Sequence, residues 1–478
     1  MAIELRPSQL EAVDQIRAAI ASGKRAPLLQ AATGFGKTCV FSYIASRAIA
    51  AGKRVLILCH RVELVDQISD TLNRFDVTHS FIASEYGYNP TAQVHVASVF
   101  TAARRLDHIP KPDLIIQDEA HHCTLNSTWG KILGHFKDVL RIGVTATPRR
   151  LSGEPLGDLF DSLIIATPMR QLIQQGVLSD YRMYAPTQVV IKDVKTRAGD
   201  YAKDQLAGFM DRPSITGDAV ASYRQFASGR RAVAFCVSVA HATHTADAFR
   251  AAGFAAAEID GECAKLDRRR IIQDFRDGRI QVLTSCDLIS EGFDLPAIEV
   301  GIFLRPTQSL TIWLQQLGRC LRSMPGKQHA YLLDHASNAQ RHGLPDEVRE
   351  WSLDGKEQKK TKQESPCKMC RQCFAVWPLH VKVCGYCGWE FEVKPREVEQ
   401  KEGELREMTQ EELEAMRLRY RDRAQEQGQA RSLEALKDIE RRRGYKRGWA
   451  EIVWKQRQHK QSAFTTRTYL DGRYRPGQ

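Results

Sequence analysis

Two short groups of residues carry the side chains that phosphate chemistry needs. The first is Ala31-Ala32-Thr33-Gly34-Phe35-Gly36-Lys37-Thr38, and the second is Asp118-Glu119-Ala120-His121. In the first group, small residues allow backbone N–H groups to curl around an anion at the start of a helix. Lys37 can then reach the β and γ phosphates of a nucleotide, and the Thr38 hydroxyl can bind magnesium. We expect the phosphate-binding loop to consist of Thr33, Gly34, Gly36, Lys37 and Thr38.

The acidic group supplies the other half of a phosphoryl-transfer site. Asp118 can bind the same magnesium ion, and Glu119 can polarise the water that attacks the γ phosphate. Such reactions require mainly positioning and neutralisation of charge, which both carboxylates provide together with Lys37. Either group alone also occurs by chance, as a glycine-rich turn or as a solvated helix start. Their order along one chain favours a nucleotide site.

Apolar runs beside these groups indicate the elements that position them. Pro27-Leu28-Leu29-Gln30 precedes the phosphate loop, residues 113–117 precede the acidic group, and apolar residues recur at helical spacing from 39 to 51. The first two runs are typical of buried strands and the third of a helix. Because open α/β sheets bind ligands at the carboxyl ends of their strands, both groups should meet there.

Further motifs make the chain resemble the superfamily 2 helicases and translocases of DEAD/DEAH-box type. They occur in the family's order, at Arg6-Pro7-Ser8-Gln9, 59–67, 96–99, Thr145-Ala146-Thr147-Pro148, Glu291-Gly292-Phe293-Asp294 and 315–322. The resemblance implies ATP and Mg²⁺ as cofactors. It also assigns roles to matching residues: adenine contact to Gln9, completion of the nucleotide site to Gly292, Asp294 and Gln315, and coupling of hydrolysis to movement to His121, Thr145 and Thr147.

Two arginines in the last motif can act on the phosphates. Arg319 and Arg322 are three residues apart in a helix predicted from Ser309 to Ser323, so their guanidinium groups should share one helix face. A pair of this kind can stabilise the charge that develops on a transferred phosphoryl group. An exposed arginine pair is the ordinary alternative, but Gln315 and Gly318 match the family motif as well.

Alternation of apolar strands with periodic helices predicts an α/β fold with parallel sheets covered on both faces. The expected strands are 27–30, 55–59, 95–98, 114–117 and 142–145 in the first half, and 232–237, 256–259, 281–285, 300–304 and 330–333 in the second. Residues 151 to about 182 should connect the halves. The predicted domains are RecA-like lobes at 1–165 and 166–348, a charged linker at 349–365, a zinc ribbon at 366–394 and a charged, helical basic tail at 395–478.

Four cysteines have the spacing of a structural zinc site. Cys370 and Cys373 can form one thiolate knuckle, and Cys384 and Cys387 a second, with a hairpin arm between them. Cys367 is a fifth candidate, which would replace Cys373 if the first knuckle were 367/370. Disulfides are the alternative, and they are disfavoured in a reducing compartment.

Composition and charge indicate the kind of partner and the cellular location to expect. The chain has 478 residues and a net charge of +12, which favours a polyanionic partner. It has no apolar run of membrane-spanning length and no secretory signal at its start. We therefore expect no membrane contact and a location in the cytoplasm of a bacterial cell or phage-infected host.

The basic tail allows two interpretations. Its cations at 441–443, 446–447, 455 and 457 alternate with Tyr445, Trp449 and Trp454, so the tail can bind phosphates and stack on bases. Equally, its aromatic residues can pack on the ribbon and leave the charges in water. Either the ribbon or the tail can also dock a protein partner.

The arrangement of motor, four-cysteine ribbon and basic tail is similar to RadD-type bacterial proteins and phage helicases, which implies DNA rather than RNA as the track. We predict an ATP-dependent DNA helicase or translocase that acts in replication, recombination or repair. One alternative is an RNA helicase or strand-annealing motor. The other is a nucleic-acid clamp that ATP binding closes without movement.

Overall fold

The computed structural model describes residues 4–150, 153–185, 194–197, 200–261, 263–286, 298–354, 366–392, 426, 429–430, 432–445, 448–451 and 453–454. They fall into two compact units, Met1–Val393 and Lys394–Gln478. Gly292 and Asp294, which the sequence predicts as nucleotide ligands, lie outside the described residues. Most of the tail also lies outside them.

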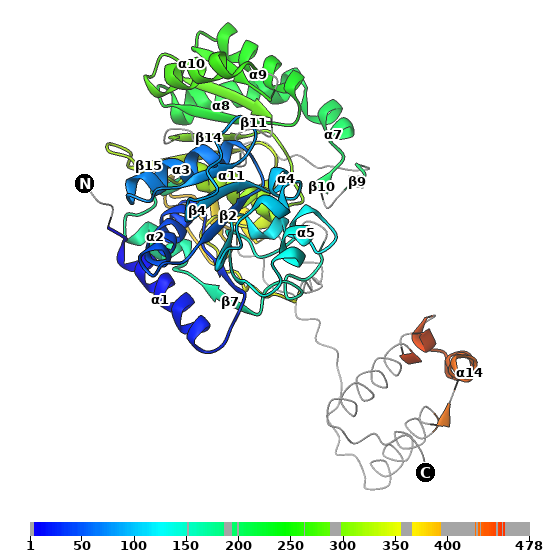
Figure 1. Cartoon of the computed structure of the whole chain (residues 1–478). Coiled ribbons are helices and arrows are strands. Elements are labelled where there is room, and N and C mark those ends of the chain that lie inside the picture. The colour runs from blue at the N-terminus through cyan, green and yellow to red at the C-terminus, as the bar shows by residue number, and fades with distance from the viewer. Residues whose placement is uncertain are drawn as a thin grey trace, which may run out of the picture. The chain divides into compact units, whose positions relative to one another are not determined.

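The first lobe, coloured blue to cyan in Figure 1, is built on a seven-stranded parallel sheet of order β3-β4-β2-β5-β6-β1-β7. Its inner strands are buried on both faces, which explains their continuous apolar sequences. The elements are α1 (Pro7–Ala21), β1 (Pro27–Gln30), α2 (Lys37–Ala50), β2 (Val55–Cys59), α3 (Glu63–Arg74), β3 (Ser80–Ile82), β4 (Val94–Ser98), α4 (Val99–Ala102), η1 (Leu106–His108), β5 (Leu114–Gln117), η2 (Ala120–His122), α5 (Thr128–His135), β6 (Leu140–Thr145) and β7 (Ser162–Ile165).

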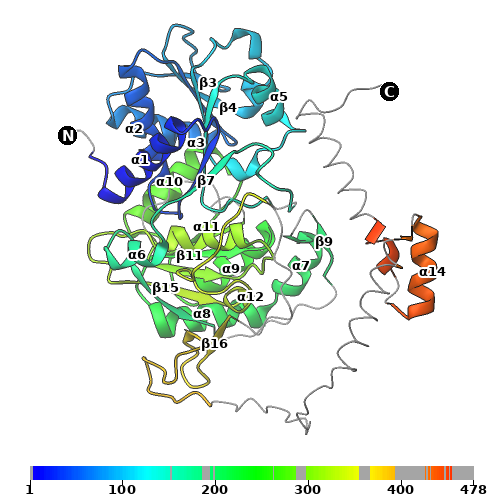
Figure 2. The same ribbon diagram turned by 90° about the horizontal axis from the view of Figure 1, so that it is seen from below.

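The second lobe contains a six-stranded parallel sheet of order β12-β13-β11-β14-β15-β8. Figure 2 shows the two sheets as separate bodies with α11 on the side of the second lobe that faces the first. The elements are α6 (Met169–Gln174), β8 (Asp180–Tyr184), β9 (Thr196–Arg197), β10 (Asp200–Tyr201), α7 (Lys203–Met210), α8 (Pro213–Ala227), β11 (Ala232–Cys236), α9 (Val239–Ala251), β12 (Ala256–Ile259), α10 (Lys265–Arg276), β13 (Val282–Cys286), β14 (Val300–Phe303), α11 (Leu310–Cys320), β15 (His329–Asp334) and α12 (Asn338–His342).

The predicted α/β class with two parallel sheets is confirmed, and each of the ten predicted strands is present within a residue or two. Five further strands of the two lobes were not predicted, namely β3, β7, β8 and the two-residue strands β9 and β10. Strands β3, β7 and β8 lie at the edges of the two large sheets, and polar residues interrupt the apolar pattern of β3 and β8. The apolar run Leu163-Ile164-Ile165 of β7 falls instead in the segment that was predicted to connect the lobes. The predicted connector therefore contains β7, α6 and the start of β8.

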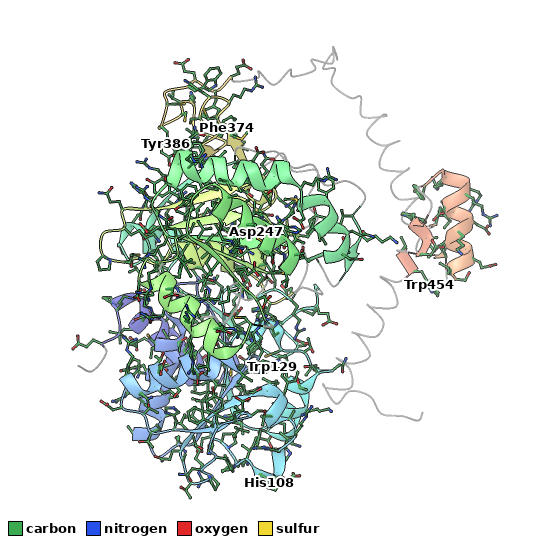
Figure 3. All side chains as sticks on the ribbon, turned by 90° about the horizontal axis from the view of Figure 1, so that it is seen from above. His108, Trp129, Asp247, Phe374, Tyr386 and Trp454 are labelled. Carbon is green, nitrogen blue, oxygen red and sulfur yellow. The ribbon has the colours of Figure 1, made fainter. Side chains whose placement is uncertain are left out.

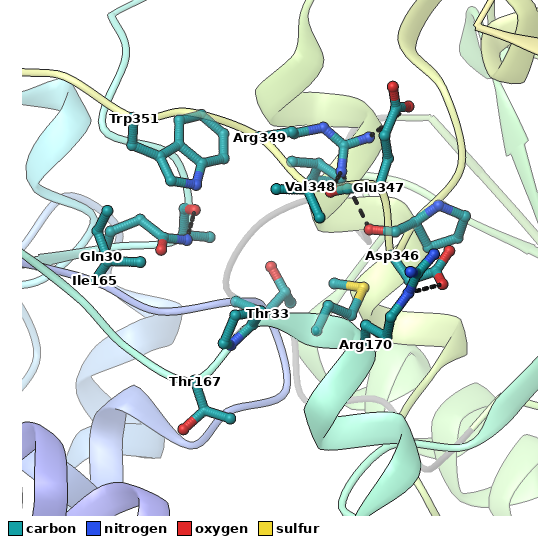
Figure 4. Close-up of a pocket in the computed structure, with 16 residues that line it drawn as sticks. Gln30, Thr33, Ile165, Thr167, Arg170, Asp346, Glu347, Val348, Arg349 and Trp351 are labelled. Atoms are coloured by element: carbon teal, nitrogen blue, oxygen red, sulfur yellow. Dashed lines mark hydrogen bonds and ion pairs between the residues drawn. The ribbon is translucent and has the colours of Figure 1, made fainter.

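A segment that we call the interlobe strap, residues 344–354, runs from the second lobe back to the first. The Arg349 guanidinium donates to the carbonyls of His342, Leu344, Pro345 and Glu347, which fixes its curved path. Figure 4 shows Glu347 and Arg349 of the strap beside an apolar cavity of about 120 Å³ that Ile165, Leu314 and Trp351 help to line.

The end of the strap is bound to the first lobe. The carbonyl of Leu353 accepts hydrogen bonds from the backbone N–H groups of Leu156 and Gly157 at 2.9 and 3.0 Å. Trp351 lies under the guanidinium of Arg149. Residues 349–354 were predicted as part of a solvated linker, but their apolar side chains pack on the lobe instead.

The ribbon begins with β16 (Cys367–Met369) and β17 (Val376–Pro378), which pair antiparallel. It is attached to the second lobe by a backbone bond from Ala185 N–H to the Phe374 carbonyl and by the guanidinium of Arg182 over the ring of Tyr386. Figure 3 shows Phe374 and Tyr386 at this end of the molecule, far from His108 in the first lobe.

The described part of the tail forms a small helical unit with a core of its own. Helix α14 (Leu433–Arg443) ends at Gly444, whose φ of +64° suits a left-handed helix end. The Glu440 carboxylate then accepts the N–H groups of Gly448 and Ala450. Tyr445 and Trp449 pack against this unit's own buried residues, Ala430, Leu436, Ile439, Ala450 and Val453.

Candidate nucleotide site between the two lobes

A polar cavity of about 350 Å³ lies where the lobes meet. It contains most residues of the phosphate loop, both acidic residues and both arginines that the sequence singled out. Its lining is Arg6, Thr33, Gly34, Gly36, Lys37, Thr38, Leu64, Gln67, Asp118, Glu119, Val177, Arg319, Arg322 and Ser323.

The backbone of the phosphate loop depends on its two glycines. Gly34 and Gly36 have φ angles of +90° and +91°, a region that residues with a Cβ seldom adopt. Gly36 also packs so closely that a Cβ there would lie 2.5 Å from Nε2 of Gln9. Ala31, where the usual motif has its first glycine, does not have a positive φ, so alanine is tolerated there.

Gln9 supports the loop directly. Its side-chain amide donates to the Phe35 carbonyl at 2.9 Å, and its Oε1 accepts the N–H of Arg6 at 3.0 Å. Arg6 donates to the same Phe35 carbonyl. The side chain of Gln9 is only 4% exposed, and its amide contacts the phosphate loop directly.

The two carboxylates follow β5 at its carboxyl end, as predicted. Glu119 adopts a left-handed backbone with φ of +47°, which is uncommon for a residue with a side chain and is typical of functional sites. Its carboxylate lies 3.8 Å from the Lys37 ammonium. Burial, reinforced by the charge of Glu119, raises the pKa of Asp118 above its usual range. A divalent cation held by Asp118 and Thr38 would offset this cost, so the donor set suits magnesium.

A series of buried contacts leads from the acidic group to the second lobe. His121 Nδ1 lies 3.4 Å from Glu119 and 2.9 Å from the Thr145 hydroxyl. The Thr145 hydroxyl donates to the carbonyl of Thr147 at 3.0 Å. The Thr147 hydroxyl in turn donates to the hydroxyl of Thr311 in α11 at 2.9 Å. These contacts place the coupling residues predicted by the sequence in one connected network.

The helix α11 brings the arginines to the cavity. Ser309 caps its start by accepting the N–H of Ile312, and Gly318 faces the first lobe so closely that a Cβ would lie 2.2 Å from Cβ of Thr33. The prediction that Arg319 and Arg322 share one helix face is wrong, because α11 ends at Cys320. Arg322 instead forms a backbone bridge with Leu178, which still directs it to the cavity.

Gln315 lies within α11 and is 3% exposed, and it is not among the residues that line the polar cavity. The sequence did not identify Thr311, Leu64, Gln67 and Val177 individually, although Leu64 and Gln67 lie in a quoted motif. No spacing rule marks a single hydroxyl such as that of Thr311, because its partner is distant in the sequence.

Comparison with known proteins decides the family. A family model described as "Type III restriction enzyme, res subunit" matches residues 2–150, and one described as "Helicase conserved C-terminal domain" matches residues 217–324. A 51.5 kDa protein of a Lactococcus phage is 36% identical over 372 residues, which cover 77% of this chain and 79% of that protein. The chain belongs to the superfamily 2 helicases. This helicase hydrolyses ATP, as its two matched domains and the cavity between its lobes indicate.

Other relatives agree with this assignment. The putative ATP-dependent helicase IRC3 of Saccharomyces cerevisiae is 29% identical, and the match covers 69% of this helicase and 51% of the yeast protein. The type I restriction enzyme EcoKI endonuclease subunit of Escherichia coli is 27% identical over 67% of this chain and 33% of the subunit. In structure, a fragment of a putative HsdR subunit from Vibrio vulnificus matches with a TM-score of 0.57 at 22% identity, covering 74% of this chain and 67% of the fragment, which confirms the fold.

The ribbon of this helicase also contains a group of four cysteines that could hold a metal ion. The Sγ atoms of Cys370, Cys373, Cys384 and Cys387 all lie within 4.8 Å of one another, close enough for one tetrahedral ion to bind all four. Cys367 is excluded from this cluster, because it lies in β16 and its thiol donates to the Ala339 carbonyl at 3.2 Å. The choice of 370/373 over 367/370 is therefore confirmed.

Proposed function

We propose that this helicase couples ATP hydrolysis to movement along DNA or to its remodelling. The observation that supports coupling is the network from Glu119 through His121, Thr145 and Thr147 to Thr311. It joins the carboxylate that would orient water to the helix that presents Arg319 across the lobe boundary. A change at the γ phosphate can thereby bias the position of the second lobe.

Each part of the cavity has a proposed role in hydrolysis. The phosphate loop and Lys37 bind the β and γ phosphates, Thr38 and Asp118 hold Mg²⁺, and Glu119 orients the attacking water. Arg319 and Arg322 stabilise negative charge on the transferred group. Gln9 and Gln315, with Gly292 and Asp294 outside the described residues, are proposed to complete the site on the basis of the family motifs.

DNA is favoured over RNA as the partner. The matched family model carries the name of a restriction enzyme subunit, and the EcoKI relative is a restriction endonuclease subunit. Relatives described as ATP-dependent RNA helicases, such as DBP3 of Yarrowia lipolytica, are more distant at 23% identity. The net charge of +12 suits either polyanion, so it supports nucleic acid in general.

The proposal is tested by ATP hydrolysis without nucleic acid and with single-stranded DNA, duplex DNA, forked DNA or RNA. We expect DNA to increase kcat, and we expect Glu119→Gln to abolish that turnover while it still binds ATP. Hydrolysis that no nucleic acid changes would contradict the motor proposal for this chain.

Two alternatives give different results in the same experiments. An RNA helicase or annealing motor would respond most to RNA, or would hydrolyse ATP with DNA yet displace no strand from a forked duplex. An ATP-gated clamp would bind DNA more tightly with ATP and show no multiple turnover.

The ribbon and tail are proposed as accessory parts of the motor. Zinc is the proposed ion in the ribbon, because four thiolates close a tetrahedral shell. Exposed apolar side chains on the ribbon, Leu379, Val383 and Trp389, favour a protein partner there. In the described part of the chain no helix is both long and apolar enough to cross a membrane, and we propose a cytoplasmic location in a bacterial cell or infected host.

A further inference from the structure

One lysine outside the family motifs holds the end of the arginine-bearing segment. Lys327 lies in the loop between α11 and β15, in a turn that its own N–H closes on the Met324 carbonyl at 3.1 Å. Its ammonium donates to the carbonyls of Cys320, of Arg322 at 2.8 Å and of Ile298 at 2.7 Å. All three N–H donors of the side chain are thus used, each on a different backbone carbonyl.

These hydrogen bonds lie at the C-terminal end of α11, where backbone carbonyls have no partner within the helix. The last carbonyls of an α-helix have no partner within the helix, and a cation is favoured there by the helix dipole. Cys320 is the last residue of α11, and Arg322 is already beyond it. The carbonyl between them, that of Leu321, accepts the N–H of Ser179 at 2.8 Å. Consecutive carbonyls from 320 to 322 are therefore all bound.

The same contacts position two side chains of the nucleotide cavity. Arg319 directly precedes the bound carbonyls, Arg322 carries the last of them, and both side chains line the cavity. The third acceptor, Ile298, precedes β14, so Lys327 ties this segment to the sheet of the second lobe. A shift of about 1 Å in a catalytic group can lower a rate by about a hundredfold.

We propose that Lys327 is a positioning residue for ATP hydrolysis, which holds Arg319 and Arg322 at the distance from the phosphates that the transition state requires. This inference rests on the proposed role of the two arginines. It predicts that loss of Lys327 affects the transition state far more than it affects the binding of ATP.

The ionisation of Lys327 provides an independent measurement. Burial lowers the pKa of the ammonium to about 8, against the opposing effects of Cys320 and Glu299. The Cys320 thiol has its own pKa raised to about 12 by burial, so it stays neutral through this range. The Glu299 carboxylate beside this loop pairs with Arg231 at 3.8 Å, and the Arg231 guanidinium also contacts the Met324 sulfur at 3.5 Å. Above pH of about 8, Lys327 loses a proton and one donor, and turnover should fall.

The experiment compares Lys327→Met and Lys327→Arg with a matched control, Lys53→Met. Lys53 is an exposed lysine that pairs with Asp113 at 3.5 Å, outside the cavity. We expect Lys327→Met to lower kcat by about tenfold or more with KM for ATP changed by less than about threefold, and Lys53→Met to have no effect. Affinity for ADP–aluminium fluoride, which mimics the transferred phosphoryl group, should fall by the same factor as kcat, whereas affinity for ADP alone should not change.

The outcomes separate positioning from simple stabilisation. If folded Lys327→Met keeps wild-type kcat, or if ADP and its fluoride complex lose affinity equally, the inference is wrong. If Lys327→Met does not fold, the pH profile decides: wild-type kcat should decline around pH 8, and Lys327→Arg should move that decline to higher pH. An unchanged decline in Lys327→Arg overturns the inference. Hydrolysis by the wild type that DNA does not stimulate contradicts the proposed motor instead, and the Lys327 comparison can then be made on basal hydrolysis.

Discussion

A single methyl group at Gly318 should keep the lobes from closing over the nucleotide. A Cβ at this position would lie 2.2 Å from Cβ and 2.5 Å from Cγ2 of Thr33, where 3.4 Å is the start of ordinary contact. The backbone of α11 or of the phosphate loop must therefore move by about 1 Å. Because Arg319 follows Gly318 directly, that movement withdraws it from the phosphates.

The expected loss of kcat in Gly318→Ala is about 10- to 100-fold, which corresponds to about 1.4 to 2.7 kcal/mol in the activation barrier. Folding should not suffer, because alanine in a helix is favoured over glycine by up to about 1 kcal/mol. The assay is DNA-stimulated ATP hydrolysis together with thermal unfolding. Gly134→Ala is the control, since a Cβ at that glycine in α5 meets nothing within 4 Å. A folded Gly318→Ala variant with kcat within about twofold of wild type would refute the reasoning that hydrolysis requires this lobe contact.

Three further outcomes are expected. Glu119→Gln should lower kcat by about 10² to 10⁴ while it leaves the Kd for ATP within a few fold, as nucleotide titration and steady-state assays can measure. Thr147→Val and Thr311→Val should each lower the free energy of unfolding by about 1–3 kcal/mol, because each leaves a buried hydroxyl without its 2.9 Å partner. Urea unfolding should show that the loss in the double variant is smaller than the sum of the two single losses. Full additivity would argue against the contact. Cys384→Ser should remove the expected one zinc per chain and lower Tm, and reduced wild-type protein purified without chelator that contains no zinc would rule out the ion.

Local sequence patterns were sufficient to predict those features that depend on residues close together in the chain. The strand before the phosphate loop, Gly34 and Gly36 within it, and the two cysteine knuckles all depend on short-range geometry, so spacing alone predicted them. Edge strands such as β8 were missed because polar, partly exposed residues such as Asp180 and Arg182 interrupt the apolar signature that the inner strands show. The end of α11 was also placed too late, since backbone pairing of Arg322 with Leu178 from a distant segment stops the helix.

The sequence by itself determined the chemistry: a loop for phosphates, carboxylates for a metal and a water, arginines for developing charge, and thiolates for an ion. Tertiary structure alone decided how these parts contact one another. Three contacts join segments that are far apart in the chain or in different motifs. They are the hydrogen bond between the hydroxyls of Thr147 and Thr311, the packing of Gly318 on Thr33, and the hydrogen bonds from Lys327 to three carbonyls. Such contacts depend on where the two sheets place their connecting loops, and no periodicity or spacing encodes them.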